Sequence, residues 1–422
     1  MAGTRQDAGR QIVVIGAGLA GLAAAYILDN AREQVTLLEA RARVGGRVYT
    51  ARDFQANQHA ELGAELLDAP HVHTRAHHYV RHFGLSLAPN NPDDLGSIVW
   101  LNERLYDAED RRLWRGYENV ERALANADPA GLTISAWLDA QNPPPNVRAM
   151  LTSLITAEFG DPARVGLDYF LHMSAVYADV EDDDTEVYRI AGGNDALAAA
   201  FAAALGGALR LNSPVEAVRQ EADGAEVIYR GGSLRADLVI VAAPLPALRH
   251  IDFTPALPGI VQAAIRETNY AAHVKVATQY ARRFWIAAGT AEAVIPPDSV
   301  YWDTGQGADG TPGILMGYHE RGFNDLVDAE RLARSAAGVA RLADGTPAGI
   351  LGARTHLWRD DPLAGGSYSA FGPGQFGRFN AALRERYGAL IFAGEHTDAR
   401  FPGYMEGALR SGERAARMVL ER

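Results

Sequence analysis

Three glycines near the start of the chain have the spacing of a dinucleotide-binding turn. Gly16, Gly18 and Gly21 form a G-x-G-x-x-G pattern, and Glu39 follows eighteen residues after the last of them. In such a turn the first glycine makes the bend, the second lets the backbone approach a pyrophosphate, and the third lets a helix pack on a strand. Glu39 is placed to accept hydrogen bonds from an adenosine ribose. The pattern predicts a dinucleotide cofactor; the alternative is a packing turn in an unrelated α/β fold.

A second group of glycines and arginines bears on the choice between NAD and FAD. Arg41, Gly45, Gly46 and Arg47 follow directly after Glu39. At this position they are suited to wrap the remaining pyrophosphate and the ribityl chain of an extended cofactor. We therefore expect FAD, although the same residue types elsewhere would indicate an ordinary loop.

Lys275 is the only lysine in the chain, because 39 of the 40 basic residues are arginine. A composition so biased towards arginine suggests that arginine cannot serve at this one position. An ammonium group is compact and can hold a single water, whereas a guanidinium group is planar, forked and bulkier. Lys275 lies in a strand-like alternation over residues 273–278. We interpret it as a functional residue; the alternative is an accidental surface lysine.

Several histidines offer two other kinds of chemistry that we do not favour. Acid–base catalysis could be assigned to His396 with Glu395 and Glu406. A metal site could be assigned to a cluster of four histidines in residues 70–82, namely His71, His73, His77 and His78. That segment is typical of the start of a helix, and no acidic partner stands at ligand spacing. We expect no metal site.

The elements that must position these residues begin with a βαβ unit. Residues 11–15 form a short apolar run typical of a buried parallel strand, residues 19–30 an alanine-rich helix, and residues 34–39 a second strand. Further along, residues 216–230 alternate as a small meander. Residues 237–244 and 389–393 are further strands, and the second of them leads into a C-terminal helix.

Two long insertions interrupt this dinucleotide-binding pattern. The first, from about 90 to 190, is expected to be mostly helical, and the second, from about 255 to 380, to be mixed. At 422 residues two domains are expected. The predicted fold is α/β, with a discontinuous Rossmann-like FAD-binding domain and an inserted α+β substrate domain. The boundaries are 1–89, 190–254 and 381–422 for the FAD-binding domain, and 90–189 and 255–380 for the substrate-binding domain.

Composition excludes several classes of function. The net charge of −12 would repel nucleic acid and attract a cationic substrate. The absence of cysteine excludes disulfides, thiolate metal sites, cysteine nucleophiles and a flavin attached through a cysteine. No stretch approaches the roughly 18 apolar residues that span a bilayer. We expect a soluble, cytoplasmic protein without a membrane partner, and a homodimer is compatible with the sequence.

Four motifs along the chain carry a resemblance to a known family. They are Glu39-x-Arg41-x-Arg43-Val44-Gly45-Gly46-Arg47, Glu61-Leu62-Gly63-Ala64-Glu65, Ile391-Phe392-Ala393-Gly394-Glu395-His396 and Gly403-Tyr404-Met405-Glu406-Gly407-Ala408. In this order they resemble the flavin amine oxidases, which include monoamine, polyamine and L-amino-acid oxidases. The resemblance extends from residue 11 to residue 420 and is weakest in the helical insertion.

The resemblance implies a set of FAD contacts. It places Glu39 on the adenosine ribose, Arg47 near the phosphates, Val215 beside the adenine through its backbone, Glu395 on the ribityl–phosphate portion and Met405 beside the isoalloxazine. The other cofactor-binding residues that it implies lie in the same motifs: Gly63, Ala64, Glu65, Gly394 and Ala408.

The resemblance also assigns the catalytic side chains. In monoamine oxidases a cysteine in a Gly-Gly-Cys-Tyr segment tethers the flavin, and the matching segment here is Gly365-Gly366-Ser367-Tyr368. Serine replaces cysteine, so we expect FAD to be noncovalent. Tyr368 and Tyr404 match two aromatic residues that form a cage facing the flavin. Lys275 matches the lysine that binds a water at flavin N5.

The implied reaction is oxidation of an amine by hydride transfer to flavin N5. It gives an imine that hydrolyses to a carbonyl compound, and dioxygen reoxidises the flavin to give hydrogen peroxide. L-amino-acid oxidases of the family place an arginine soon after the Glu-Leu-Gly-Ala segment, where this chain has Glu65. We therefore expect small-molecule amines without a carboxylate. An L-amino-acid oxidase is the first alternative, followed by a flavin desaturase acting on C–C bonds and a noncatalytic FAD-binding scaffold.

Overall fold

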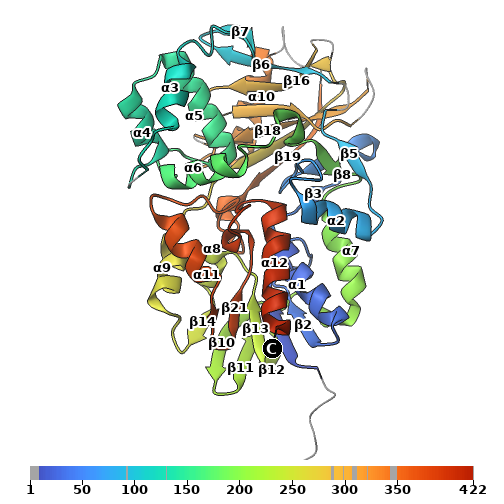
Figure 1. Cartoon of the computed structure of the whole chain (residues 1–422). Helices are drawn as coiled ribbons and strands as arrows, with labels where there is room; N and C mark the ends of the chain where they lie inside the picture. Colours follow the sequence, from blue (N-terminus) through green and yellow to red (C-terminus); the bar gives the residue numbers. More distant parts are fainter. Residues whose placement is uncertain are drawn as a thin grey trace, which may run out of the picture.

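The structure of the protein is a computed structural model. It describes residues 9–91, 94–129, 131–286, 289–297, 299–306, 311–320, 322–342 and 349–421. The elements form two tiers, which Figure 1 shows one above the other. The lower tier contains the first strand and the C-terminal helix, and the upper tier contains the long segments between them.

The lower tier is built around the βαβ unit expected from the sequence. Strand β1 (Gln11–Ile15) and helix α1 (Leu19–Asn30) have the predicted bounds, and β2 (Gln34–Leu38) ends one residue earlier than expected. β1 and β2 pair in parallel along their whole length. Because β2 ends at Leu38, Glu39 lies at its carboxyl end, beside the turn between β1 and α1.

Two sheets share this tier. The first has the order β20-β21-β13-β1-β2-β9, and all its pairs are parallel except β20 with β21. Its other strands are β9 (Leu209–Arg210), β13 (Leu238–Val241), β20 (Arg386–Tyr387) and β21 (Leu390–Phe392). Helix α1 packs against α7 (Asp195–Leu205) and α12 (Met405–Leu420). The smaller sheet has the order β12-β11-β10-β14. The meander expected over residues 216–230 forms β10 (Val215–Glu221) and β11 (Gly224–Tyr229), and β12 (Gly232–Ala236) and β14 (Asp252–Thr254) complete the sheet.

A seven-stranded sheet forms the upper tier, in the order β19-β15-β18-β17-β16-β6-β7. Its strands are β6 (Gly96–Leu101), β7 (Arg104–Asp107), β15 (Val274–Tyr280), β16 (Thr290–Ile295), β17 (Ser299–Asp303), β18 (Gly313–His319) and β19 (Ile350–Leu357). Figure 1 shows four helices grouped beside this sheet: α3 (Tyr117–Leu124), α4 (Ile134–Gln141), α5 (Pro145–Phe159) and α6 (Leu167–Val176). Helix α10 (Asp328–Leu342) packs against β15 and β19.

The first insertion contains more strand than we expected. Residues 90–190 supply the four helices, but they also supply β6 and β7, which join strands from the second insertion. β6 pairs in parallel with β16, almost two hundred residues away in the chain. A short apolar run such as Gly96–Leu101 is ambiguous from periodicity alone, so its partner decides its conformation.

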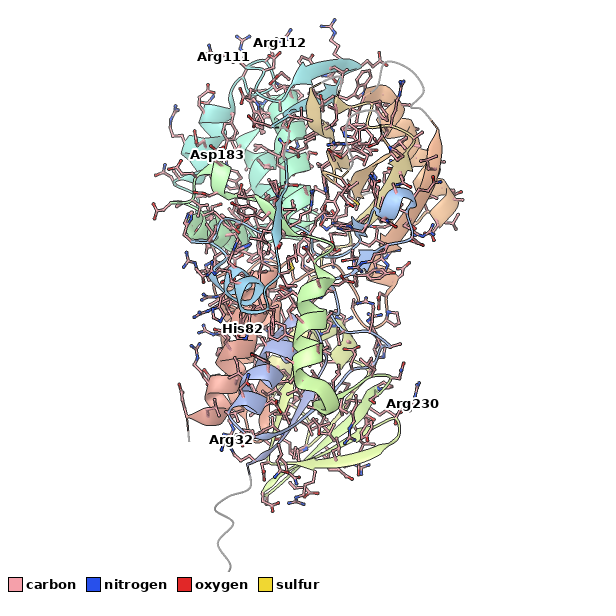
Figure 2. All side chains as sticks on the ribbon, turned by 90° about the vertical axis from the view of Figure 1, so that its right-hand side faces the viewer. Arg32, His82, Arg111, Arg112, Asp183 and Arg230 are labelled. Carbon is pink, nitrogen blue, oxygen red and sulfur yellow. The ribbon has the colours of Figure 1, made fainter. Side chains whose placement is uncertain are left out.

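The remaining helices and strands are short. They are α2 (Thr74–His82), β3 (Thr50–Ala51), β4 (Ala60–Glu61), β5 (Leu87–Pro89), β8 (Tyr188–Ile190), α8 (Leu245–Leu248), α9 (Gly259–Glu267) and α11 (Ala381–Leu383). Among the described residues, no helix combines the length and apolar content needed to cross a membrane. Figure 2 shows charged side chains at both ends of the molecule, with Arg111 and Arg112 opposite Arg32.

Candidate active site

The glycine turn after β1 has the geometry that phosphate binding requires. Gly16 has a φ of +99°, and a Cβ at Gly21 would lie 1.9 Å from the carbonyl oxygen of Gly16. A Cβ at Gly18 would meet no heavy atom within 4 Å. The first and third glycines are therefore needed for the bend and for helix packing, while the second leaves open space at the N-terminus of α1.

The second glycine element lies directly against this turn. The Gly45 amide donates to the Ala17 carbonyl at 2.8 Å, and Gly45 and Gly46 have φ values of +93° and +56°. The Glu39 carboxylate is buried, and it accepts hydrogen bonds from the amides of Ala17 and Arg41, both at 2.8 Å. These contacts hold Glu39 beside the turn.

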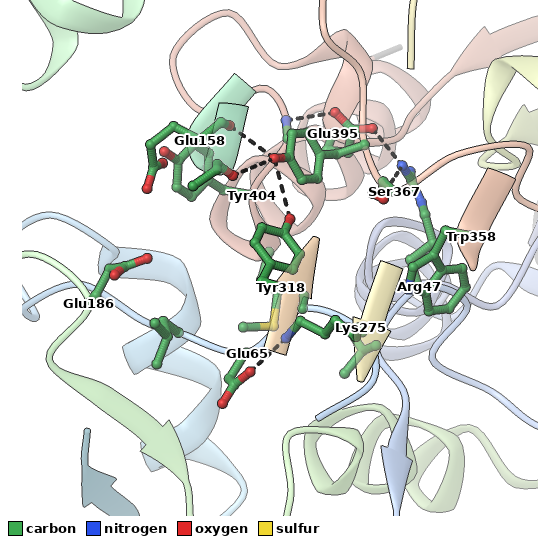
Figure 3. A pocket seen from close by; sticks show the side chains of 18 of the residues that line it. Arg47, Glu65, Glu158, Glu186, Lys275, Tyr318, Trp358, Ser367, Glu395 and Tyr404 are labelled. Atoms are coloured by element: carbon green, nitrogen blue, oxygen red, sulfur yellow. Dashed lines mark hydrogen bonds and ion pairs between the residues drawn. The ribbon is translucent and has the colours of Figure 1, made fainter. Parts of the chain in front are cut away.

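Arg47 and Glu395 join motifs that are far apart in the sequence. The Arg47 guanidinium lies 2.9 Å from Glu395 Oε1 and donates to the Ser367 carbonyl at 3.1 Å, as Figure 3 shows. Glu395 also accepts from the Ser369 hydroxyl and from the Gly403 amide, each at 2.6 Å. Burial raises the pKa of Glu395, but the charges of Arg47 and His396 and the hydrogen bonds from Ser369 and Arg47 together outweigh burial and lower the pKa overall.

One cavity of about 400 Å³ extends from the glycine turn into the upper tier. The predicted cofactor residues that line it are Gly18, Arg47, Gly63, Ala64, Glu65, Gly394, Glu395, Met405 and Ala408. The remaining predicted cofactor residues lie outside this lining: Gly16, Gly21, Glu39, Arg41, Gly46 and Val215. The three predicted catalytic residues also line the cavity: Lys275, Tyr368 and Tyr404.

Arg41 and Val215, which lie outside the cavity lining, make contacts elsewhere in the protein. Arg41 forms an ion pair with Asp361 at 2.7 Å. Val215 begins β10 and pairs with Tyr229 of β11. The partners of these two residues, Asp361 and Tyr229, do not line the cavity. If Arg41 and Val215 bind the cofactor, they would contact a part of it that lies outside this cavity.

Lys275 lies on β15 with its side chain almost fully buried. Its Nζ donates to Glu65 Oε2 at 2.6 Å and to the Glu61 carbonyl at 3.0 Å, and it lies 5.2 Å from the ring centroid of Trp302. An ammonium group has three donors. These two contacts leave one donor for a further ligand.

Glu65 was predicted to contact the cofactor, but its carboxylate is engaged within the protein. Besides Lys275, it accepts from Arg189 Nε at 3.1 Å and from Trp302 Nε1 at 2.9 Å. Burial would raise the pKa of Glu65, but the charges of Lys275 and Arg189 lower it overall. Glu65 therefore acts as the counter-ion of Lys275, whatever else it contacts.

Tyr368 and Tyr404 both line the cavity, and Tyr368 lies against Gly403, the residue that precedes Tyr404. The Tyr368 hydroxyl donates to the carbonyls of Ala157 and Glu158, at 3.1 and 3.0 Å. Gly403 lies against the Tyr368 ring, since a Cβ there would be 3.5 Å from that ring. The Tyr404 hydroxyl is hydrogen-bonded to the Glu158 side chain. Both tyrosines are thus fixed through one helix end, at Ala157 and Glu158.

Several cavity residues were not found from the sequence. They are Glu158, Glu186, Glu292, Trp302 and Tyr318. Tyr318 sits opposite Lys275 in the pairing of β15 with β18, and its ring stacks on His273 with centroids 4.2 Å apart. A correct pairing of these two strands would have identified Tyr318, but a single sequence does not supply that pairing.

The fold and the cavity together define the class of protein. It has a dinucleotide-binding domain, and the glycine turn of that domain opens into an aromatic pocket that the seven-stranded sheet covers. The chain belongs to the flavin containing amine oxidoreductase family, whose sequence model matches residues 19–420. It is therefore a flavin-dependent amine oxidoreductase. Its motifs and its fold class were both predicted correctly from the sequence.

Individual relatives agree with this assignment. The chain is 30% identical to a Mycobacterium tuberculosis protein assigned as flavin-containing monoamine oxidase AofH, over 97% of this chain and 96% of that protein. It is 27% identical to the L-amino-acid oxidase of Gloydius halys, over 97% and 89% of the two chains. The structure of cyclohexylamine oxidase from Brevibacterium oxydans superimposes with a TM-score of 0.88 and 24% identity, covering 98% of this chain and 100% of that one. That last likeness shows the fold.

Proposed function

We propose that this protein binds FAD noncovalently and oxidises the C–N bond of small amines that carry no carboxylate. The charge of the cavity lining carries this proposal. Among the described residues that line the cavity, the cationic side chains are Arg47 and Lys275. Each is neutralised by a glutamate, Glu395 and Glu65 respectively. A substrate carboxylate would find no free cation there.

The residues that would hold FAD are distributed along the cavity. The turn at Gly16, Gly18 and Gly21 suits the pyrophosphate, Glu39 the adenosine ribose, and the Arg47–Glu395 pair the ribityl and phosphate portion. The open space at Gly18 is an observation of this structure that fits such a ligand. When bound, the flavin supplies acceptance of a hydride equivalent and transfer of electrons to dioxygen.

The chain's own residues position the amine and control its proton. Alkylammonium groups have a pKa of about 10.4, yet only the neutral amine has the lone pair that assists oxidation. Aromatic walls from Tyr318, Tyr368 and Tyr404 disfavour the charged form at the reacting position. Lys275 has one donor left for a water, which we propose lies at flavin N5.

The proposal also includes the division of the chain into domains. The six-stranded sheet is made up of strands at 11–15, 34–38, 209–210, 238–241 and 386–392, and the seven-stranded sheet of strands at 96–107 and 274–357. This distribution supports an FAD-binding domain of residues 1–89, 190–254 and 381–422, and a substrate domain of residues 90–189 and 255–380. Residues 1–8 and 422 lie outside the described part.

An anaerobic substrate panel tests the proposal. The yellow holoenzyme is mixed with alkylamines, arylalkylamines and L-amino acids, and the flavin absorbance is followed. Amines without a carboxylate should bleach the flavin, and admission of oxygen should restore the colour with formation of hydrogen peroxide. Bleaching by L-amino acids alone would instead establish an L-amino-acid oxidase, the activity named for the Gloydius halys relative. No bleaching by any compound would leave a desaturase or a noncatalytic scaffold.

A further inference from the structure

A buried arginine, Arg189, lies behind the wall of the cavity that contains Lys275. Arg189 is the middle residue of β8; it is 7% exposed and does not line the cavity itself. Its guanidinium donates to three backbone carbonyls, those of Asn90, Asp303 and Thr304, at 3.3, 3.2 and 2.9 Å. These carbonyls fix its orientation, but a buried cation also needs a partner of opposite charge.

Glu65 is the anionic partner of Arg189. Arg189 Nε donates to Glu65 Oε1 at 3.1 Å, and Lys275 Nζ donates to Glu65 Oε2 at 2.6 Å, the contact that Figure 3 shows. Trp302 Nε1 also donates to Oε1, at 2.9 Å. The carboxylate therefore lies between two cations, and each of its oxygens faces one of them.

The three charged residues come from separate parts of the chain. Glu65 follows β4, Arg189 pairs with Ala88 of β5, and Lys275 lies on β15. The position of the Lys275 ammonium therefore depends on a series of contacts. It begins at the carbonyls that hold Arg189 and passes through the Glu65 carboxylate.

Arg189 also affects the charge of Glu65. A buried lysine and glutamate could both become neutral if one proton moved from the ammonium nitrogen to a carboxylate oxygen. The guanidinium group of an arginine does not give up a proton in proteins, so its charge persistently favours the carboxylate form. Burial raises the pKa of Glu65, but the charges and hydrogen bonds of its partners, with Lys275 and Arg189 foremost, outweigh burial and lower the pKa overall.

We propose that Arg189 is a positioning residue for Lys275. It holds Glu65 as a carboxylate in one orientation, and Glu65 in turn holds the Lys275 ammonium with its third donor free for a water. Arg189 touches neither substrate nor cofactor and acts only through Glu65. This inference rests on the role of Lys275 in the proposed function.

Other titratable groups near Glu65 have to be separated from it in a test. Glu61, Glu186 and His59 all interact electrostatically with Glu65. Burial raises the pKa of Glu61 to about 7, and the Glu61 carbonyl also accepts from Lys275. A titration in an Arg189 variant is therefore compared with the parent over the same pH range, and is assigned to Glu65 by adding Glu65→Gln.

The single lysine of the chain makes the contact directly observable by NMR spectroscopy. A holoenzyme labelled only in lysine reports the Cε–Hε group of Lys275 alone. In the parent the two Hε protons should give separate signals, because two hydrogen bonds fix the side chain. In Arg189→Gln the pKa of Glu65 should rise by about 1–3. The lysine signal should then show an additional titration as Glu65 takes up a proton, and Arg189→Gln with Glu65→Gln should lack it.

Stopped-flow kinetics test whether Arg189 acts through Lys275. Arg189→Gln should slow the half-reaction that Lys275→Met slows, by about tenfold, the contribution of a hydrogen bond to a charged group. Added to Lys275→Met it should have no further effect, since residues in one network are not additive. Arg189→Lys keeps the charge and should be less impaired than Arg189→Gln.

The matched control is Arg331→Gln. Arg331 is a buried arginine of α10 that pairs with Asp328 and lies outside the cavity lining. Its replacement removes a buried guanidinium elsewhere and should leave both half-reactions and the lysine signal at their parent values. Flavin absorbance and the thermal midpoint check that each variant is folded. If Arg189→Gln does not fold, Arg189→Lys takes its place in the kinetic comparison.

The outcomes separate the inference from the function on which it rests. One averaged Hε signal in the parent would overturn the inference whether or not any variant folds. It would also be overturned if folded Arg189→Gln kept the parent's lysine signal and rates, or if its effect added to that of Lys275→Met. If Lys275→Met slows neither half-reaction, the proposed role of Lys275 is wrong, and the lysine signal alone decides whether Arg189 holds the pair.

Discussion

Replacement of Lys275 by methionine removes the one lysine of the chain and should affect both stability and turnover. The Lys275–Glu65 contact of 2.6 Å corresponds to a gross attraction of about 6 kcal/mol at an effective dielectric constant of about 20. Desolvation offsets much of that attraction. Loss of one partner from a buried pair costs about 3–5 kcal/mol. Because Arg189 and Trp302 remain on Glu65, we expect the lower end, about 3 kcal/mol.

This loss of stability converts to a small shift in melting. The entropy of unfolding is about 2.1 cal/mol/K per residue, so a chain of 422 residues should melt about 3 °C lower. The effect on turnover should be much larger. If Lys275 holds a water at flavin N5, loss of a well-placed donor of about 2.7–4 kcal/mol slows flavin reduction, reoxidation or both by about a hundredfold.

Stopped-flow measurements of anaerobic reduction and of reoxidation separate the two half-reactions. Lys275→Arg keeps the charge but replaces a compact ammonium with a bulkier guanidinium, so it should also be slow. Glu65→Gln serves as the control for stability, because it disrupts the same pair and keeps the lysine. If both lysine variants reduce and reoxidise at the parent's rates, the uniqueness of Lys275 in the sequence is an accident of composition.

Three further outcomes follow from the site. Tyr404→Ala should lower kcat/KM for amines by about tenfold while FAD stays bound, whereas Tyr404→Phe, which keeps the ring, should retain most of the activity; equal losses in both variants would assign the effect to the hydroxyl. Acid precipitation should release all flavin into the supernatant because Ser367 replaces the tethering cysteine, and yellow colour left in the pellet would contradict noncovalent binding. The KM for a cationic amine should fall as pH rises through about 7, where Glu158 loses its proton, and Glu158→Gln should flatten that profile.

The cofactor half of the molecule could be predicted because its signals are local. The bounds of β1 and α1 follow from an apolar run, a glycine turn and an alanine-rich segment that are adjacent in the chain. β6 was missed because its conformation depends on β16, which follows much later in the sequence. Local patterns therefore identified the dinucleotide-binding unit but left one edge of the upper sheet unassigned.

The substrate half of the site could be predicted only where a residue was unusual. Lys275 was identified because it is the only lysine, but its ion pair with Glu65 was not predicted, because the motif does not reveal which way the Glu65 side chain points. Glu158, Glu186 and Glu292 are ordinary members of a set of 52 acidic residues. Only the packing of α5, the segment before β8 and β16 around one cavity distinguishes them.

The distribution of charge along the cavity reconciles two requirements that would otherwise conflict. Oxidation needs a neutral amine, whereas a cationic substrate needs negative charge to bind it. At the cofactor end of the cavity, Arg47 and Lys275 are each balanced by a glutamate. This end therefore attracts neither cations nor anions strongly. The carboxylates of Glu158, Glu186 and Glu292 line the other end of the cavity, where they can attract a cationic amine before it loses its proton.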